Sequence, residues 1–175
     1  AAFVSAIPET EGYVHTLHTY VPPSPAAPGA DRFPWLERRD YFATNPEFFS
    51  LNESGQRVPN QQLCFANAGL RAELTKNVLR HVELAGGQVL VEVSAMDNPG
   101  PFCACPGCRA LETAYQSPGG PIYDYLIELC RLLGTRDPAA KVKTLAYRRS
   151  QTQKPPVLPD GGRLPDNLVV DFAPI

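Results

Sequence analysis

The chain has 175 residues, enough for one domain with its own core, and its hydrophobic share of 43% is ordinary for a globular protein. The 16 Lys and Arg residues stand against 18 Asp and Glu residues, a net charge of −2, so the chain lacks the basic surface that binds nucleic-acid phosphates. No apolar run approaches the roughly 20 residues needed to cross a bilayer, and we expect no membrane span.

Proline recurs through residues 1–46, which predicts mostly loop, because proline interrupts helices and central strands. One short extended piece is expected from Tyr13 to Tyr20. The chain starts without Met or a cationic leader, so we expect the true N-terminus to lie upstream. Residues 47–65 predict a small hairpin around the turn Asn52-Glu53-Ser54-Gly55.

Regular elements are predicted from residue 66 onward. Residues 67–86 predict a helix, because Leu70, Leu74, Val78 and Val82 form one apolar stripe that ends at glycine. Residues 88–96 are β-branched and predict a strand. A second helix is expected over 121–133, closed by Gly134, and two more strands over 141–147 and 167–172.

This alternation predicts an α/β fold with parallel strands and outer helices over residues 66–175. A closed eight-stranded barrel takes about 250 residues, so the chain is either a small open sheet or part of a (β/α)8 TIM-type barrel. We favour the barrel, with residues 1–175 forming one partial domain.

The strand over 88–96 separates two kinds of side chain. Alternation places Val89, Val91, Val93 and Ala95 toward the helices, and leaves Glu92 and Ser94 toward the barrel interior. Asp97 and Asn98 follow at the carboxyl end, where α/β folds bind their ligands. A simple turn at Asp97 and Asn98 is an equal alternative, and for Glu92 we favour a hydrogen-bonded structural acid over a catalytic one.

Two further residue types could reach the same edge. Tyr147 ends a later strand, where its phenol could bind a sugar hydroxyl or an amide, although an aromatic cap on the core is an alternative. His15 and His18 lie three residues apart, hence on opposite faces of an extended chain. They predict no joint metal site, and one of them could face the pocket while the other faces solvent.

Cysteines form the densest motif. Cys103, Cys105 and Cys108 lie within six residues, Cys-Pro-Gly-Cys predicts a tight turn, and Cys64 is the candidate for a fourth metal ligand. Structural zinc and a disulfide are equal alternatives, the disulfide being suited to an exported protein. Either bond would brace the loop after the strand, whereas Cys130 is expected to pack within its helix.

Several short motifs together resemble the bacterial domain-of-unknown-function family 4838 from about His18 to the C-terminus. In chain order they are Tyr41-Phe42, Asn45-Pro46-Glu47-Phe48-Phe49, Gly55-Gln56-Arg57, Gln62-Leu63-Cys64, the strand end from Ser94 to Asn98, Cys103-x-Cys105-x-x-Cys108, Ser117-Pro118-Gly119-Gly120-Pro121, Leu145-Ala146-Tyr147 and Pro155-Pro156.

The resemblance implies a barrel similar to glycoside hydrolases, and activity like that of endo-β-N-acetylglucosaminidases on N-glycans. Such enzymes use the substrate's N-acetyl group as nucleophile, one carboxyl group as proton donor and another residue to orient the acetamide. By position, Asp97 would match the strand-end acid, with His18, Asn98 and Tyr147 as substrate contacts. The chain departs from the family at Ile127, where Asn is usual, and at Asp171, where a basic residue is frequent.

A second catalytic carboxyl group is not evident from the sequence, and Glu47, Glu92 and Asp171 are options beside a residue outside the chain. An enzyme would have a pocket at the strand carboxyl ends lined by Asp97, Asn98 and Tyr147, and a carboxyl group of raised pKa there. A non-catalytic carbohydrate-binding or scaffold domain would need no such carboxyl group, and a metal- or disulfide-braced interaction module is a third possibility. We expect a glycan as partner, further domains of a longer chain and an extracytoplasmic location.

Overall fold

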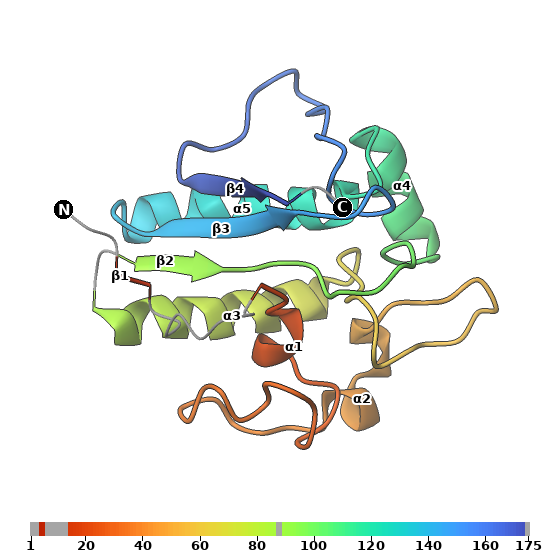
Figure 1. The fold of residues 1–175 in the computed structure, drawn as a ribbon, viewed down its shortest axis with the longest axis horizontal. Coiled ribbons are helices and arrows are strands. Elements are labelled where there is room, and N and C mark those ends of the chain that lie inside the picture. The colour runs from red at the N-terminus through yellow and green to blue at the C-terminus, as the bar shows by residue number, and fades with distance from the viewer. Residues whose placement is uncertain (1–3, 6–13, 87–88, 174–175) are drawn as a thin grey trace.

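The computed structural model describes residues 4–5, 14–86 and 89–173. Four strands form one parallel sheet in chain order: β1 (Val4–Ser5), β2 (Val89–Glu92), β3 (Lys141–Ala146) and β4 (Leu168–Phe172). Figure 1 shows β2, β3 and β4 running in the same direction, so their carboxyl ends lie at one edge of the sheet. The predicted α/β fold with parallel strands is confirmed.

Two long helices cover one face of this sheet. In α3 (Ala68–Ala85), the side chain of Asn67 accepts a hydrogen bond from the backbone N–H of Leu70, and Gly86 ends the helix in the left-handed conformation at φ 71°. The second helix is α5 (Gly120–Arg136), which starts with Pro121 in its first turn. Gly134 does not end it as predicted, because the helix continues to Arg136 and closes at Asp137.

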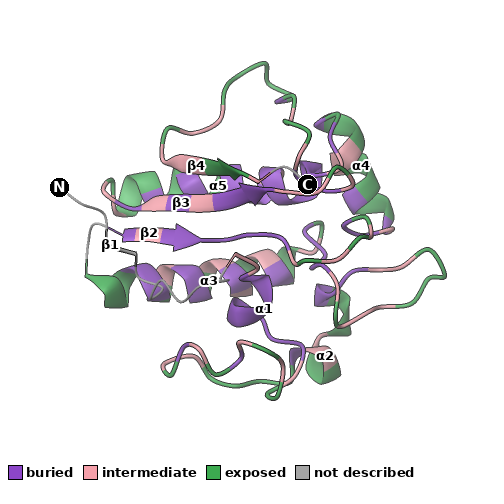
Figure 2. Cartoon of the chain, in the orientation of Figure 1, coloured by how far each residue is buried: buried purple, intermediate pink, exposed green. Residues whose placement is uncertain are grey.

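The predicted division of β2 into two faces is confirmed. Val89, Val91 and Val93 belong to the hydrophobic core that the apolar stripes of α3 and α5 complete, and Figure 2 shows β2 as buried except for one intermediate stretch at Leu90. On the other face, the buried carboxylate of Glu92 lies 2.8 Å from Nζ of Lys143 on β3 and accepts a hydrogen bond from Ser94 Oγ at 2.9 Å. Glu92 is therefore the structural acid that we favoured.

The segment before α3 departs from its prediction. Residues 17–20 form a helical turn, α1 (Leu17–Tyr20), instead of an extended piece, while Tyr13 lies outside the described residues. The turn forms because Thr16 is hydrogen-bonded to β2 and accepts the first helical bonds. Two short elements follow, α2 (Tyr41–Thr44) and the 3-10 helix η1 (Pro46–Phe48). The hairpin over 47–65 reduces to two isolated antiparallel bridges, Phe49 with Leu63 and Leu51 with Arg57.

One helix was missed by sequence analysis. Cys105-Pro-Gly-Cys108 is the start of α4 (Pro106–Ala114) and not an isolated tight turn, because Cys105 Sγ caps the helix by accepting the N–H of Cys108. The described residues contain no helix that is long and apolar enough to span a membrane.

Candidate functional site

Four side chains gather at the carboxyl edge of the sheet, and we call them the strand-end cluster: His15, Asp97, Tyr147 and Arg148. Arg148 donates to Oδ1 of Asp97 from Nη2 at 2.6 Å and from Nε at 3.0 Å. The guanidinium carbon of Arg148 lies 5.2 Å from the centre of the Tyr147 ring, and the His15 ring lies 5.4 Å from it. Segments that follow β1, β2 and β3 thus meet at one place.

Asp97 is held in its ionised form. The hydrogen bond from Arg148 lowers the pKa of this carboxyl group, and the charges of Arg148 and His15 act in the same direction. An enzyme was expected to hold a carboxyl group of raised pKa here, and Asp97 shows the opposite shift. Its ionised carboxylate can bind a cation or an N–H group, but it does not hold a proton to donate at neutral pH.

Asn98 lies at the same edge, but its backbone and side chain are engaged by the protein. Gln151 Nε2 donates to the carbonyl oxygen of Asn98 at 2.6 Å, to its Oδ1 at 3.2 Å and to the carbonyl oxygen of Gly100 at 3.0 Å. Because Gln151 joins Asn98 to Gly100, Asn98 helps to organise the loop after β2, and its Nδ2 is buried without a hydrogen-bond partner among the described residues.

His18 is buried on α1 and is not part of the strand-end cluster. Its side chain packs beside Phe49, with 6.1 Å between ring centres, and its Nε2 has no hydrogen-bond partner. Burial lowers the pKa of His18 to about 4. Of the two predicted alternatives, His15 is the histidine that faces the edge, while His18 faces the interior and not solvent.

The neutral, buried His18 predicts a loss of stability in acid. Its pKa is about 6.5 in the unfolded chain and about 4 in the folded one, so the unfolded state takes up the proton first and the loss grows as pH falls from 6.5 toward 4. Between pH 6.5 and 5 we expect a loss of about 2 kcal/mol from this residue. Urea unfolding of the wild type and of His18→Gln at both pH values measures the contribution of His18. Between the two pH values, the variant should lose less unfolding free energy than the wild type. Equal losses would contradict a neutral His18.

Four buried thiols form a second site, the cysteine cluster: Cys64, Cys103, Cys105 and Cys108. Their sulfur atoms all lie within 4.8 Å of one another, with 3.5 Å between Cys64 and Cys105 and 3.9 Å between Cys64 and Cys108. A tetrahedral zinc ion with Zn–S bonds of 2.3 Å requires sulfurs about 3.8 Å apart. The cluster could therefore hold a metal ion, and Cys64 is the fourth member as predicted.

The thiols of the cluster differ in acidity: hydrogen bonding with Cys103 raises the pKa of Cys64 to about 11 and also raises the pKa of Cys108, whereas Cys103 is the thiol favoured as a thiolate. The backbone N–H of Leu51 donates to Sγ of Cys103 at 3.2 Å, and hydrogen bonds from Cys108 and Cys64 lower the pKa of Cys103 further. Arg57 lies beside Cys64 and interacts with its sulfur. The five cysteines are free in the structure, so the disulfide alternative is not formed there, and Cys130 is buried within α5 as expected.

Close packing brings the start of α4 to Cys64. A Cβ atom on Gly107 would lie 2.7 Å from Cβ of Ala66, so only glycine allows the Cys105–Cys108 turn to approach the Cys64 segment this closely. The same segment holds the loop after β2, because Gln62 donates to the carbonyl oxygen of Met96 at 2.7 Å and accepts its N–H at 2.9 Å. The segment that carries Cys64 thus contacts the backbone of the residue before Asp97.

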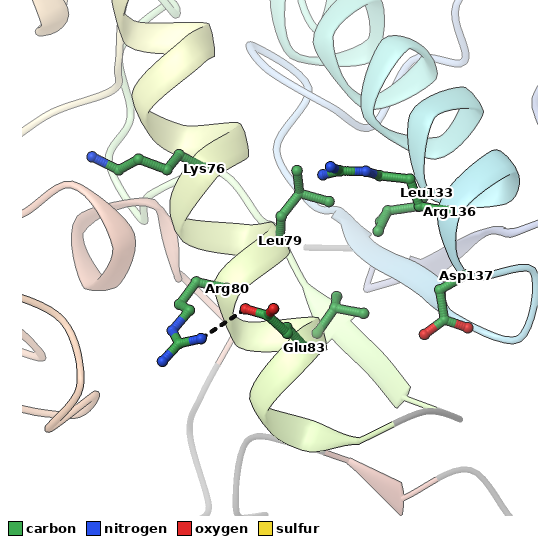
Figure 3. Close-up of a pocket in the computed structure, with 8 residues that line it drawn as sticks. Lys76, Leu79, Arg80, Glu83, Leu133, Arg136 and Asp137 are labelled. Carbon is green, nitrogen blue, oxygen red and sulfur yellow. Dashed lines mark hydrogen bonds and ion pairs between the residues drawn. The ribbon is translucent and has the colours of Figure 1, made fainter.

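One cavity lies elsewhere, between α3 and α5. It has a volume of about 530 Å³, an apolar floor of Leu79, Val82 and Leu133, and charged residues at its rim, of which Arg80 is paired with Glu83 at 2.7 Å (Figure 3). Two smaller cavities lie against α3 beside Trp35 and against α5 beside Leu158. None of these three is lined by the strand-end cluster.

Sequence reasoning did not single out Arg148, Gln62 and Gln151. Arg148 directly follows Tyr147 at the end of β3, so its position was a usable signal. Gln62 was noted only as part of the motif Gln62-Leu63-Cys64, and Gln151 was not noted, because they act on backbone groups that lie 34 and 53 residues away, respectively.

Comparison with known proteins gives one match. The model of the family described as "Domain of unknown function (DUF4838)" matches residues 11–175. No curated protein and no solved structure matches the chain.

Proposed function

Since this chain belongs to the DUF4838 family, we propose that it is the βα part of a glycoside-hydrolase-like barrel that binds N-acetylglucosamine-containing glycans at its strand-end cluster and takes part in their hydrolysis. The observation that carries the proposal is the meeting of His15, Asp97 and Tyr147 at the carboxyl edge of neighbouring parallel strands. Barrel enzymes bind their substrates at this edge. An extracytoplasmic location goes with this class of substrate.

The strand order of the sheet and the placement of its helices support the proposal of a barrel. Its strands neighbour one another in chain order, and α3 and α5 pack on one face only. In a doubly wound sheet the strand order reverses at one point and helices cover both faces. In a barrel the strands follow chain order and the helices cover the outer face alone. Within the part of the chain that the structure describes, β4 pairs only with β3, and Val170 and Phe172 on its outer face are 39% and 61% exposed. We propose that further βα units of a longer chain cover them.

The charge of Asp97 defines its part in the reaction. An ionised carboxylate beside Arg148 can accept the N–H of a substrate acetamide and stabilise positive charge that develops at the anomeric carbon. It does not donate a proton in this state. In the proposal, the proton donor is therefore another group, which a further part of the barrel brings to the same edge.

We propose that the metal of the cysteine cluster is zinc and that its role is structural. Four thiolates fill a tetrahedral coordination sphere, so no position remains for water or substrate. The ion would join the Cys64 segment to the loop after β2 and so hold the backbone that carries Asp97. No step of the hydrolysis runs through it.

A non-catalytic carbohydrate-binding domain is the second candidate, and one observation favours it. The neighbours that shift the pKa of Asp97 most are Arg148, His15 and Tyr147, and none of them is a second carboxyl group. Binding needs hydrogen-bonding and aromatic groups but no proton donor.

Cleavage of a defined glycan tests the proposal. The complete protein, including the further parts of the barrel, is incubated with a glycopeptide that carries an N-linked glycan, and the masses of the products are measured by mass spectrometry. Endo-type hydrolysis leaves one N-acetylglucosamine on the peptide. Binding of N,N′-diacetylchitobiose without cleavage would favour the second candidate, and the absence of both would contradict a carbohydrate site.

A further inference from the structure

The backbone next to His15 is held in place by hydrogen bonds to the region of β2. The next residue, Thr16, is tied to the region of β2 by three hydrogen bonds: Oγ1 donates to the carbonyl oxygen of Glu92 at 2.8 Å and accepts the N–H of Ser94 at 3.1 Å, and the backbone N–H donates to the carbonyl oxygen of Ser94 at 3.3 Å. A side chain on such a support reaches its ligand with little loss of conformational freedom.

The hydrogen bond of His15 fixes its tautomer. Nδ1 lies 2.6 Å from the carbonyl oxygen of Ala95. A carbonyl oxygen only accepts hydrogen bonds, so Nδ1 carries the hydrogen, and the neutral ring presents Nε2 as a lone-pair acceptor. No hydrogen-bond partner of Nε2 is seen among residues 14–86 and 89–173.

Exposure sets His15 apart from the other two histidines. His18 and His81 are buried, with 6% and 3% of their surface exposed, and Nδ1 of His81 is 2.8 Å from the hydroxyl of Tyr20. His15 is partly exposed and lies beside Tyr147. Among the three, it is the one that a ligand at the strand ends could reach.

We propose that His15 is a ligand-binding residue whose Nε2 accepts a hydrogen bond from a hydroxyl group of the bound sugar. The substrate class rests on the proposed function, but the acceptor role rests on the Ala95 hydrogen bond and on exposure. Asp97 and His15 then offer two fixed acceptors at one edge, which suits a neutral sugar with several hydroxyl donors better than an anion.

Nuclear magnetic resonance tests the tautomer and the ligand separately. Two-bond correlations between ring protons and nitrogens of 15N-labelled protein, at mildly alkaline pH, should show His15 with a protonated Nδ1 and a pyridine-type Nε2. Loss of signals in His15→Asn assigns them. On addition of N,N′-diacetylchitobiose, the Nε2 resonance should shift toward the pyrrole-type range, as it does on accepting a hydrogen bond.

Two substitutions give the matched pair. The amide of His15→Asn can reproduce the donor to Ala95, but it removes the acceptor, so chitobiose affinity should fall by about five- to tenfold at an unchanged melting temperature. His15→Gln can place an amide oxygen near the position of Nε2 and should retain more affinity.

The outcomes are distinct. A protonated Nε2, or an unmoved His15 while chitobiose shifts the amides of Asp97 and Tyr147, overturns the role of His15 and leaves the proposed function standing. A spectrum that chitobiose does not change overturns the proposed function and the sugar assigned to His15 together.

Discussion

Asp97→Asn is expected to lower the rate of glycan hydrolysis by about 10²- to 10³-fold while the fold stays intact. The amide keeps the shape of the carboxylate but removes the charge that Arg148 holds in place at 2.6 Å. Stabilisation of charge in the transition state is lost, whereas the partly exposed position tolerates an isosteric side chain. Initial rates on the N-linked glycopeptide with the complete protein, compared at saturating substrate, measure the effect.

Asp166→Asn is the matched control. Asp166 is also an acid paired with an arginine, Arg163 at 3.6 Å, but both side chains are 86% exposed and lie away from the strand ends. It should leave the rate unchanged. Near-normal turnover by Asp97→Asn would refute the role of Asp97, and loss of folding together with activity would indicate that Asp97 serves only as a turn residue.

The two faces of β2 were predictable because a strand alternates with a period of two. That rule alone placed Val91 in the core and Glu92 on the opposite face, although β2 ends at Glu92 and not at Met96 as predicted. The partner of Asp97 was not predictable. Arg148 is 51 residues away, and which of several exposed cations would meet Asp97 depends on how the loops after β2 and β3 pack.

Helix α4 escaped prediction because it is short, with nine residues from Pro106 to Ala114, and only Cys108 among them is buried. The signals that were present, Pro106 in the first turn and a polar cap at Cys105, were interpreted as a turn. The helix packs against α5, where Leu111 lies on a cluster that includes Ile127, and near its start Arg109 pairs with Glu53 at 2.7 Å.

The members of the cysteine cluster were predicted from the sequence, but the connection between the cluster and Asp97 was not. Three closely spaced thiols and the candidate Cys64 followed from the sequence. The coupling to Asp97 did not, because it passes through Gln62, a residue two positions before Cys64 that clamps both backbone groups of Met96. Such a clamp has no pattern in a single sequence.

Cys105→Ser is expected to lower the melting temperature by roughly 10 °C or more and to abolish stoichiometric zinc binding. Cys105 supplies a sulfur of the four-thiol cluster, so its loss opens the coordination sphere, whereas the hydroxyl of the serine can still cap α4 by accepting the N–H of Cys108. Elemental analysis of the wild type should give about one zinc ion per chain. Scanning calorimetry measures the stability, with and without a chelator.

Cys130→Ala is the matched control, because Cys130 is an equally buried cysteine that lies in α5 outside the cluster. The Cys130→Ala variant should lose some packing in α5 but should still bind zinc. Gly107→Ala provides a graded variant that retains all four thiols: the 2.7 Å approach to Ala66 forces the α4 start away from Cys64, so zinc affinity should fall while some binding remains.

Three measurements then decide what the cluster does. Zinc in the wild type, its loss in Cys105→Ser and weaker binding in Gly107→Ala support a structural metal that holds the loop after β2. A metal-free wild type whose mass is lower by two hydrogens per bond would show disulfides instead. If Cys105→Ser leaves the melting temperature and the zinc content unchanged, the convergence of four sulfurs within 4.8 Å contributes nothing to the fold, and the support proposed for Asp97 must come from Gln62 and Gln151 alone.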